Sequence, residues 1–384
     1  MSFGDYPPQW LALAGELLKG RIILVLGSVD TGKTTLVTYL ANSLVKRGKR
    51  VAIVDADVGQ SDIGPPTTIG LGLVESPIKK MREAKRLAMY FVGAISPEGY
   101  LLPMVVGTKK MVEKGLSFAD LILIDPTGLI QGAKGQALKH HKIELVNPDR
   151  IIILQKEREL EPLIAPFEGR GKIVLHRLGV AEQIRNKTKE ERRKRREEGV
   201  FNYFKDSGVH ELSTKDKILI NTFLGQGKSL QKSEIRFLSD NLQSFIFHAE
   251  LTPESLFVVT EKGSSPGRSQ GFSPSLYAPA WSGRSGVINV APTFRENGAN
   301  NLFKIRSHFK RERVHLISID YFKSLLLGLI SAEGELLELG IIKEFDLLKK
   351  RLSLFTPLKE KDRIRSIQFS EVHLDLEGRE MYTS

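Results

Sequence analysis

The chain has 384 residues, 41% of them hydrophobic and 27% charged, which is typical of a globular protein with room for two domains. Charged residues interrupt each apolar run before it reaches membrane-spanning length, and the N-terminus has no basic start followed by an apolar signal core. Cysteine is absent, which excludes disulfides and thiolate metal sites and agrees with a cytoplasmic protein. The formal net charge of +12 indicates a surface that attracts polyanions.

The first elements lead into a phosphate-binding loop. A short amphipathic helix is expected at residues 9–18, within an N-terminal segment of residues 1–20. The apolar run 21–26 then predicts a buried parallel strand, and apolar residues at helical spacing over 35–44 predict a helix. Between strand and helix stands GSVDTGKTT, which fits G-x-x-x-x-G-K-[ST] at every fixed position.

This order of strand, glycine loop and helix aims backbone N–H groups and a helix N-terminus at one anion. It therefore predicts binding of a nucleoside triphosphate. In that role Lys33 reaches the β- and γ-phosphates, and the Thr34 hydroxyl ligates Mg²⁺. The expected nucleotide-binding residues are Gly27, Ser28, Val29, Asp30, Thr31, Gly32, Lys33, Thr34 and Thr35.

Further apolar runs predict more strands, separated for the most part by helical stretches. The expected strands are 50–55, 87–93, 121–125, 150–155 and 172–176. Alternation of strand and helix predicts an α/β fold, a doubly wound and mostly parallel sheet of the P-loop NTPase type. In such sheets the ligand binds at the carboxyl ends of the strands. The glycine loop and the acids that end two other strands fall at those ends.

Carboxylates at strand ends complete the predicted site. Asp55 and Asp57 lie two residues apart at the end of one strand, and Asp125 ends another. A Mg²⁺–nucleotide centre needs a carboxylate near the metal, and a kinase needs one to orient and deprotonate the attacking hydroxyl. Asp125 competes with the first pair for the metal-side role. Gln60, Thr127 and Gly128 follow in the adjoining loops, where they are candidates for substrate contact.

A dense basic segment follows the last predicted strand of the sheet. Eight basic residues lie between Arg185 and Arg196 and predict a charged helix, with a lid at about residues 182–205. The predicted kinase domain covers residues 21–225.

Composition changes after about residue 225, and short apolar runs divided by turn residues predict a β-rich domain over 226–384. The Gly- and Ser-rich segment 263–271 is expected to be a mobile loop or an irregular excursion. Residues 332–335 are expected to form a hairpin turn.

Several segments together resemble the polynucleotide 5′-hydroxyl kinase family, the Clp/Grc type, in its stand-alone prokaryotic form. They are GSVDTGKTTL, VDADVGQSDIGPPTTIGLG, IDPTGLIQGAKGQALKHHKIELVNPD, the arginine-rich IRNKTKEERRKRREEGVFNYF and the tail GELLELGIIKEFDLLKKRLSLFTPL. Members of that family transfer the γ-phosphate of a nucleoside triphosphate to the 5′-hydroxyl of RNA or DNA with Mg²⁺. The resemblance therefore implies ATP or GTP as donor, Mg²⁺ as cofactor, and RNA and possibly DNA as partner.

The resemblance also implies roles for single residues. Asp57 matches the catalytic carboxylate that activates the 5′-hydroxyl, and Asp55 would then support the water shell of the metal. Thr127 and Gly128 match the clasp near the transferred phosphate, and Leu129 stands where many relatives have a tryptophan.

The family lid carries R-x-x-x-R, and Arg192 and Arg196 have that spacing, which puts them on one helical face. Two guanidiniums there would clamp the triphosphate and the charge that develops during transfer. Arg193 or Arg195 is the alternative member of the pair. Large eukaryotic members carry an N-terminal domain that helps to hold the base, whereas about twenty residues precede the first strand here. We therefore expect loose base discrimination.

Three other functions are compatible with the motifs. A switch ATPase or GTPase of the partition-protein kind has a lysine early in its glycine loop, where this chain has Ser28. A small-molecule ligase or kinase would also use D-T-G-K-T, but the basic lid does not favour it. A non-catalytic nucleic-acid-binding subunit would have no need of the intact catalytic residues.

Overall fold

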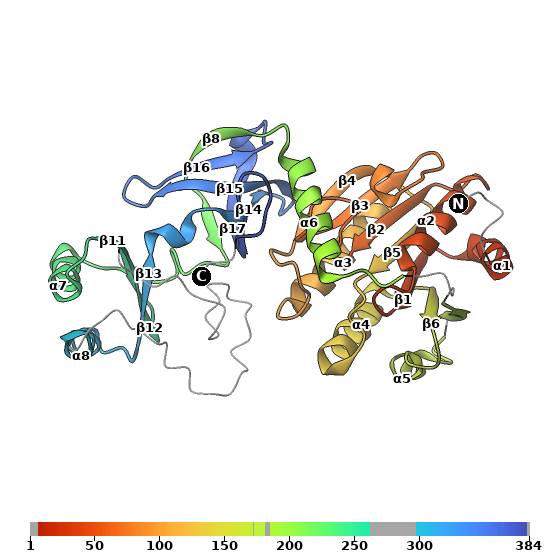
Figure 1. The fold of residues 1–384 in the computed structure, drawn as a ribbon, viewed down its shortest axis with the longest axis horizontal. Coiled ribbons are helices and arrows are strands. Elements are labelled where there is room, and N and C mark those ends of the chain that lie inside the picture. The colour runs from red at the N-terminus through yellow and green to blue at the C-terminus, as the bar shows by residue number, and fades with distance from the viewer. Residues whose placement is uncertain (1–6, 172, 181–184, 262–296, 382–384) are drawn as a thin grey trace. The chain divides into compact units, whose positions relative to one another are not determined.

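The computed structural model describes residues 7–171, 173–180, 185–261 and 297–381. The chain forms two compact units, Met1–Tyr203 and Phe204–Ser384, and each is described by itself (Figure 1). None of the helices in the described residues combines the length and apolarity needed to cross a lipid bilayer.

The first unit is built on a seven-stranded sheet with the order β4-β3-β2-β5-β1-β6-β7. All neighbouring strands pair in parallel except β3, which is antiparallel to both β2 and β4. The strands are β1 (Ile22–Gly27), β2 (Val51–Ala56), β3 (Thr68–Val74), β4 (Lys85–Phe91), β5 (Leu121–Pro126), β6 (Arg150–Gln155) and β7 (Val174–Gly179).

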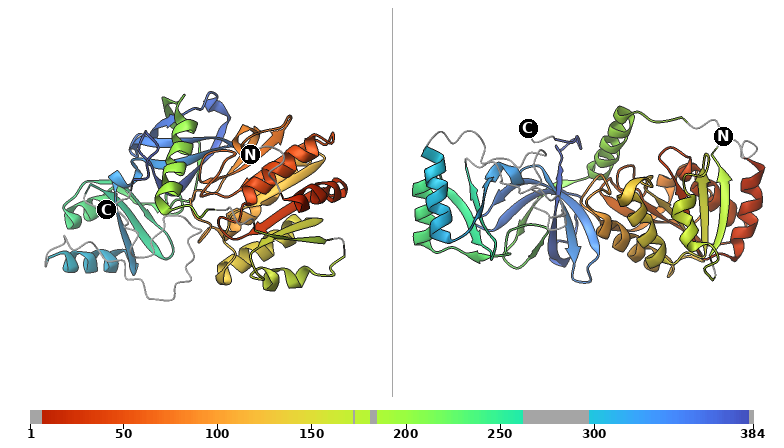
Figure 2. Two further views of the ribbon diagram at one scale, coloured as in Figure 1. Left: turned by 45° about the vertical axis from the view of Figure 1, so that its right-hand side comes forward. Right: turned by 90° about the horizontal axis from the view of Figure 1, so that it is seen from below.

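Helices cover both faces of this sheet (Figure 2). The helical segments are α1 (Pro8–Glu16), η1 (Leu17–Lys19), α2 (Lys33–Val45), η2 (Met81–Glu83), α3 (Leu101–Gly115), α4 (Gly132–Val146), α5 (Glu161–Ile164), η3 (Ala165–Phe167) and α6 (Lys189–Phe204). Leu24 and Leu26 of β1 pack in the core beneath α3 and α4, whereas Ile23 and Val25 pack beneath α1 and α2. Because both faces are buried at the centre of the sheet, β1, β2, β5 and β6 are mainly apolar runs rather than alternating strands, whereas the edge strands β4 and β7 are partly exposed.

The second unit contains two sheets and their own cores. The order of the six-stranded sheet is β8-β16-β15-β14-β17-β9, and that of the four-stranded sheet is β10-β11-β12-β13. The strands are β8 (Gly208–Ser213), β9 (Ile218–Ile220), β10 (Lys228–Ser229), β11 (Ile246–Leu251), β12 (Ser255–Thr260), β13 (Arg313–Ser318), β14 (Leu325–Ser331), β15 (Leu336–Asp346), β16 (Arg351–Thr356) and β17 (Ile364–His373). The helical segments are α7 (Lys232–Leu242), α8 (Asn297–Phe309), η4 (Ile319–Phe322) and η5 (Lys361–Arg363).

The structure confirms the predicted α/β sheet, the helix before β1 and the hairpin between β14 and β15. Strand β3 was not predicted, because its two glycines weaken the strand pattern. The units divide between Tyr203 and Phe204, earlier than the expected boundary at residue 225, because β8 and β9 pair with β16 and β17 of the second unit. The predicted loop 263–271 lies outside the described residues.

Candidate active site

The phosphate-binding loop joins β1 to α2 at the carboxyl edge of the sheet. Two of its residues have positive φ, Asp30 at 54° and Gly32 at 86°, and this left-handed turn lets the helix begin at Lys33. The first N–H groups of a helix have no acceptor in the preceding turn. The loop therefore presents these groups, with the positive end of the helix dipole, to an anion.

Lys33 is buried inside this loop, with 7% of its surface exposed. Its Nζ donates to the carbonyl of Ser28 at 2.7 Å, so the ammonium lies across the loop. Burial lowers the pKa of Lys33, and the carboxylates of Asp125, Asp57 and Asp30 oppose that change. Acids that favour the charged form thus lie near the ammonium, in the place where the motif predicts phosphate oxygens.

Asp125 contacts the threonine of the motif. Its Oδ2 accepts a hydrogen bond from Thr34 Oγ1 at 2.6 Å, whereas its Oδ1 is buried without a hydrogen-bond donor among the described residues. Burial raises the pKa of Asp125 to about 6, although Lys33 and the bond from Thr34 act against it. A hydroxyl beside a carboxylate with a free oxygen fits Mg²⁺, which takes one or two protein ligands, waters and nucleotide phosphates.

Asp55 has a different environment, although it pairs in register with Asp125 on the neighbouring strand. Its Oδ2 accepts from the backbone N–H groups of Asp62 at 2.5 Å and Ile63 at 2.9 Å, and from Ser61 Oγ at 3.2 Å. Burial, together with the nearby carboxylates of Asp125 and Asp62, raises the pKa of Asp55 well above its usual range. These bonds make Asp55 the anchor of the loop that follows β2.

Asp55 and Asp125 therefore differ in their contacts, which bears on the choice that the sequence left open between them. The expectation placed Asp55 near the metal and named Asp125 as its competitor. Asp125 bonds to Thr34, whereas the carboxylate of Asp55 is engaged by its own loop. The geometry favours Asp125 for the metal side.

Asp57 lies two residues further on and is partly exposed. Its Oδ1 accepts from the backbone N–H groups of Gly59 at 3.1 Å and Gln60 at 3.2 Å, which fixes the orientation of the carboxylate. Within the described part of the chain, no donor is recorded on Oδ2. Asp57 is also close enough to Lys33 for its charge to oppose the lowering of that lysine's pKa by burial. An oriented carboxylate with one free oxygen near the phosphate loop has the properties of a general base.

The Thr127–Gly128 segment packs directly on the phosphate loop. A Cβ on Gly128 would lie 2.7 Å from the backbone nitrogen of Val29, so only glycine permits this approach. Thr127 is held from two sides: its N–H donates to the carbonyl of Ala56 at 3.3 Å, and its carbonyl accepts from Lys139 Nζ at 2.5 Å. The structure therefore brings the predicted clasp to the predicted nucleotide site.

Two lysines of α4 that the sequence analysis missed lie in the protein interior. Lys139 and Lys142 are both 0% exposed. Burial lowers the pKa of Lys139 well below its usual range and that of Lys142 to about 7, and the charge of Asp57 opposes the shift at both. Lys139 supports Thr127, whereas Lys142 Nζ has no hydrogen-bond partner among the described residues.

The lid helix α6 begins at a capping box. Glu191 N–H donates to Thr188 Oγ1 at 3.1 Å, and Thr188 N–H donates to Glu191 Oε2 at 2.8 Å. The sequence carries the T-x-x-E pattern typical of such a start, which is the signal that could have placed the beginning of this helix. The helix then contacts the site through Gln60, whose Nε2 donates to the carbonyl of Arg192 at 3.1 Å.

Arg192 reaches the phosphate loop itself. Its Nη2 lies 2.5 Å from Oδ2 of Asp30, and the same carboxylate oxygen accepts from the N–H of Lys187 at 2.9 Å. A carboxylate of the loop thus holds the guanidinium beside the place where a triphosphate is expected to bind.

The other arginines of α6 considered for the clamp have different environments. Arg195 pairs with Asp62 at 2.7 Å, so it also faces the sheet, whereas the exposed Arg193 pairs with Glu197 on its own helix at 2.9 Å. Arg196 is half-buried. Of the two alternatives in the sequence analysis, Arg195 faces the site and Arg193 does not.

Comparison with known proteins agrees with this site. A family model described as the P-loop of the mRNA cleavage and polyadenylation factor CLP1 matches residues 27–206. A polyribonucleotide 5′-hydroxyl-kinase of Pyrococcus furiosus is 35% identical over 359 residues, which cover 94% of this chain and 89% of that protein. The chain belongs to this kinase family.

Another member, the polyribonucleotide 5′-hydroxyl-kinase of Methanocaldococcus jannaschii, is 34% identical over 361 residues, or 94% of this chain and 88% of that protein. The solved structure of wild-type Clp1p with a Pcf11p segment has a TM-score of 0.57 and 12% identity, and the match covers 95% of this chain and 78% of that one. That likeness shows the shared fold. Family membership with an intact P-loop means that the phosphate donor is a nucleotide.

Proposed function

We propose that this chain transfers the γ-phosphate of ATP or GTP to the 5′-hydroxyl end of RNA. The observation that carries the proposal is the arrangement at one sheet edge of a complete P-loop, the Thr34–Asp125 pair and an oriented Asp57. The named activity of family members that cover most of this chain supports it. DNA is a second acceptor to be tested.

The donor triphosphate binds through the backbone N–H groups of the P-loop and the ammonium of Lys33. Thr34 and Asp125 would hold Mg²⁺. When bound, the ion neutralises charge on the β- and γ-phosphates. The ammonium of Lys33, whose charged form Asp125, Asp57 and Asp30 favour, adds positive charge on the protein side.

Asp57 is the general base of the proposed reaction. Its Oδ2 takes the proton of the acceptor 5′-hydroxyl as that oxygen bonds to the γ-phosphorus. The bond from the γ-phosphorus to the β,γ-bridging oxygen breaks, and the nucleoside diphosphate leaves with that electron pair. The two N–H bonds to Oδ1 keep the carboxylate in place during this step.

The lid stabilises the charge that the transfer creates. Arg192 is the first candidate, because its guanidinium already lies beside the P-loop at Asp30. Arg196 is the second member of the proposed clamp. Gln60, Thr127 and Gly128 line the approach of the acceptor end in this proposal.

Asp57→Asn tests the proposal, since the amide keeps the size of the side chain but cannot accept the proton. Labelled γ-phosphate transfer is measured to matched 5′-hydroxyl RNA and DNA oligonucleotides, with ATP and GTP as alternative donors. We expect loss of transfer of about a hundredfold or more while nucleotide binding survives. Transfer at the wild-type rate would remove Asp57 from this role. Nucleotide hydrolysis without any transfer by the wild-type chain would instead support a switch ATPase or GTPase.

A further inference from the structure

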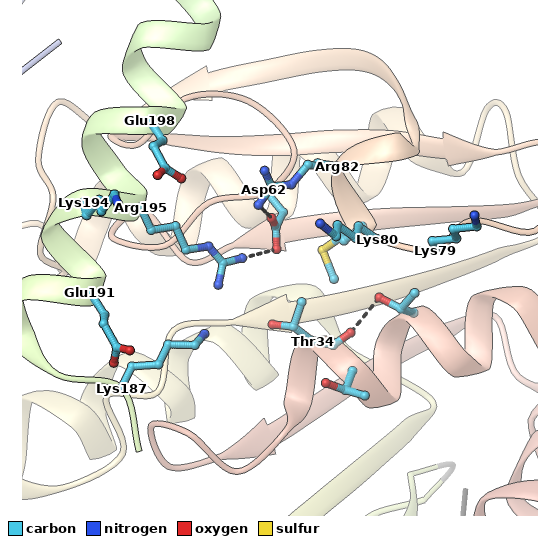
Figure 3. Close-up of a pocket in the computed structure, with 13 residues that line it drawn as sticks. Thr34, Asp62, Lys79, Lys80, Arg82, Lys187, Glu191, Lys194, Arg195 and Glu198 are labelled. Carbon is cyan, nitrogen blue, oxygen red and sulfur yellow. Dashed lines mark hydrogen bonds and ion pairs between the residues drawn. The ribbon is translucent and has the colours of Figure 1, made fainter. Parts of the chain in front are cut away.

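A pocket of about 570 Å³ lies beside the P-loop, within the first unit (Figure 3). Its floor is the outer face of α2 from Thr34 to Thr38. One wall is the segment 79–82 around η2, and the other is the lid between Lys187 and Glu198. Of the residues of the preceding mechanism, only Thr34 and the adjoining P-loop residue Thr35 are among the described residues that line it.

The lining has more basic than acidic side chains. Six basic side chains and three acidic ones face the pocket; the basic ones are Lys79, Lys80, Arg82, Lys187, Lys194 and Arg195. Burial and the positive charges of Arg195 and Arg192 lower the pKa of Lys187, although Asp30 and Asp62 oppose this. Positive charge is therefore concentrated here, and a negatively charged ligand would relieve the repulsion among these groups.

One carboxylate fixes the distance between the two walls. Asp62 lies between them with 7% of its side chain exposed, and it pairs with Arg195 of the lid at 2.7 Å and with Arg82 at 3.4 Å. Figure 3 shows the Arg195 guanidinium directed at Asp62 and the Lys80 ammonium on the opposite side of the pocket from the lid. Because the Asp62 charge is offset by two arginines, the charges left in the lining are those of four lysines and of the two acids Glu191 and Glu198, a balance that is still positive.

The chemistry of the lining selects among anions. Among the described residues that line the pocket there is no aromatic ring, and Met81 is the one largely apolar side chain. A nucleobase would find no stacking surface there, whereas phosphodiester groups would find several ammonium donors. The floor also begins at Thr34 of the nucleotide site, so a strand bound here continues from the place of transfer.

We propose that this pocket binds the phosphodiester backbone of the acceptor strand, on the 3′ side of the reacting end. Segment 79–82 and the lid grip the strand from opposite sides, and Asp62 sets the gap between them. The inference rests on the proposed function, because it takes the acceptor to be a nucleic acid.

The test variant is Lys80→Gln/Lys194→Gln, which removes one exposed charge from each wall. Lys19→Gln/Lys49→Gln removes the same total charge next to the amino ends of β1 and β2 and is the matched control. Dissociation constants are measured by fluorescence anisotropy for single-stranded 5′-hydroxyl RNAs of two and about twelve nucleotides, over a range of salt concentrations. KM values for the donor nucleotide are measured alongside.

We expect the wall variant to bind the longer RNA about tenfold more weakly, with little effect on the dinucleotide. The slope of log affinity against log salt concentration is negative, and its magnitude should decrease by about 1.4. This change corresponds to the loss of two phosphate contacts with a single strand. The control variant should match the wild type.

Equal affinity of wild type and wall variant for the longer RNA would overturn the inference. A loss confined to the KM of the donor would also overturn it, since the pocket would then hold the nucleotide. Absence of any phosphoryl transfer by the wild type would contradict the proposed function instead, while the binding measurements would still decide on the pocket.

Discussion

Replacing Lys142 by methionine should stabilise the first unit, although it removes a residue near the site. Lys142 is fully buried, and its Nζ has no hydrogen-bond partner among the described residues. Burial lowers its pKa from 10.5 to about 7. One pKa unit corresponds to about 1.4 kcal/mol, so the charged ammonium costs folding on the order of 5 kcal/mol where both states are protonated. Methionine fills a similar space without a charge.

The pH dependence identifies the cause. Because the folded pKa is lowered, the unfolded chain holds the extra proton between about pH 7 and pH 10.5, and the free energy of unfolding of the wild type rises with pH across this window. The advantage of Lys142→Met should therefore shrink from about 5 kcal/mol near pH 6 to about 2 kcal/mol near pH 9.

Urea unfolding of both full-length proteins at about pH 6, 7.5 and 9, followed by circular dichroism, measures this difference. Lys19→Met is the control, since Lys19 is exposed on η1 and should give a small difference that does not change with pH. A pH-independent difference for Lys142→Met would refute the reasoning. So would a variant less stable than the wild type near pH 6, because it would show that the ammonium has a favourable partner.

Other substitutions test the site and the lid. Arg192→Ala should lower turnover by about a hundredfold or more with little change in acceptor affinity. Arg193→Ala, at an exposed position, is the control and should stay near the wild-type rate in single-turnover assays. Equal rates for both variants would exclude Arg192 from the clamp. Lys139→Met removes the hydrogen bond to the Thr127 carbonyl, and it should lower kcat about tenfold or more while donor binding persists. An unchanged kcat would count against a positioning role for Lys139. Thr188→Ala should destabilise the start of α6 by about 1 kcal/mol, seen as faster amide hydrogen exchange in its first turn and not in α4.

The sequence predicted the parts of the site that a local pattern encodes. The P-loop needs only its own spacing and flanks, and Asp57 lies at a strand end that the apolar run before it defines. The choice between Asp55 and Asp125 needed the strand order. Because β5 lies between β2 and β1, Asp125 is on the strand beside the P-loop and Asp55 is one strand further away.

Other features depended on tertiary structure in the same way. The lid is basic on several sides, so its composition does not tell which arginine turns inward, and the contacts of Asp30 and Asp62 decide it. Lys139 and Lys142 look like ordinary helix-surface lysines in the sequence. Only the packing of α4 against the sheet buries them.

The close approach of Gly128 to Val29 has a consequence for the order of events in catalysis. The loop assigned to the acceptor and the loop assigned to the donor lie in direct contact here, with Gly128 against the backbone of Val29. Binding of one substrate should then preorganise the site for its partner, and thermodynamic reciprocity requires that the gain in affinity be the same in both directions. Such synergy would favour a ternary complex over wasteful hydrolysis of the donor alone.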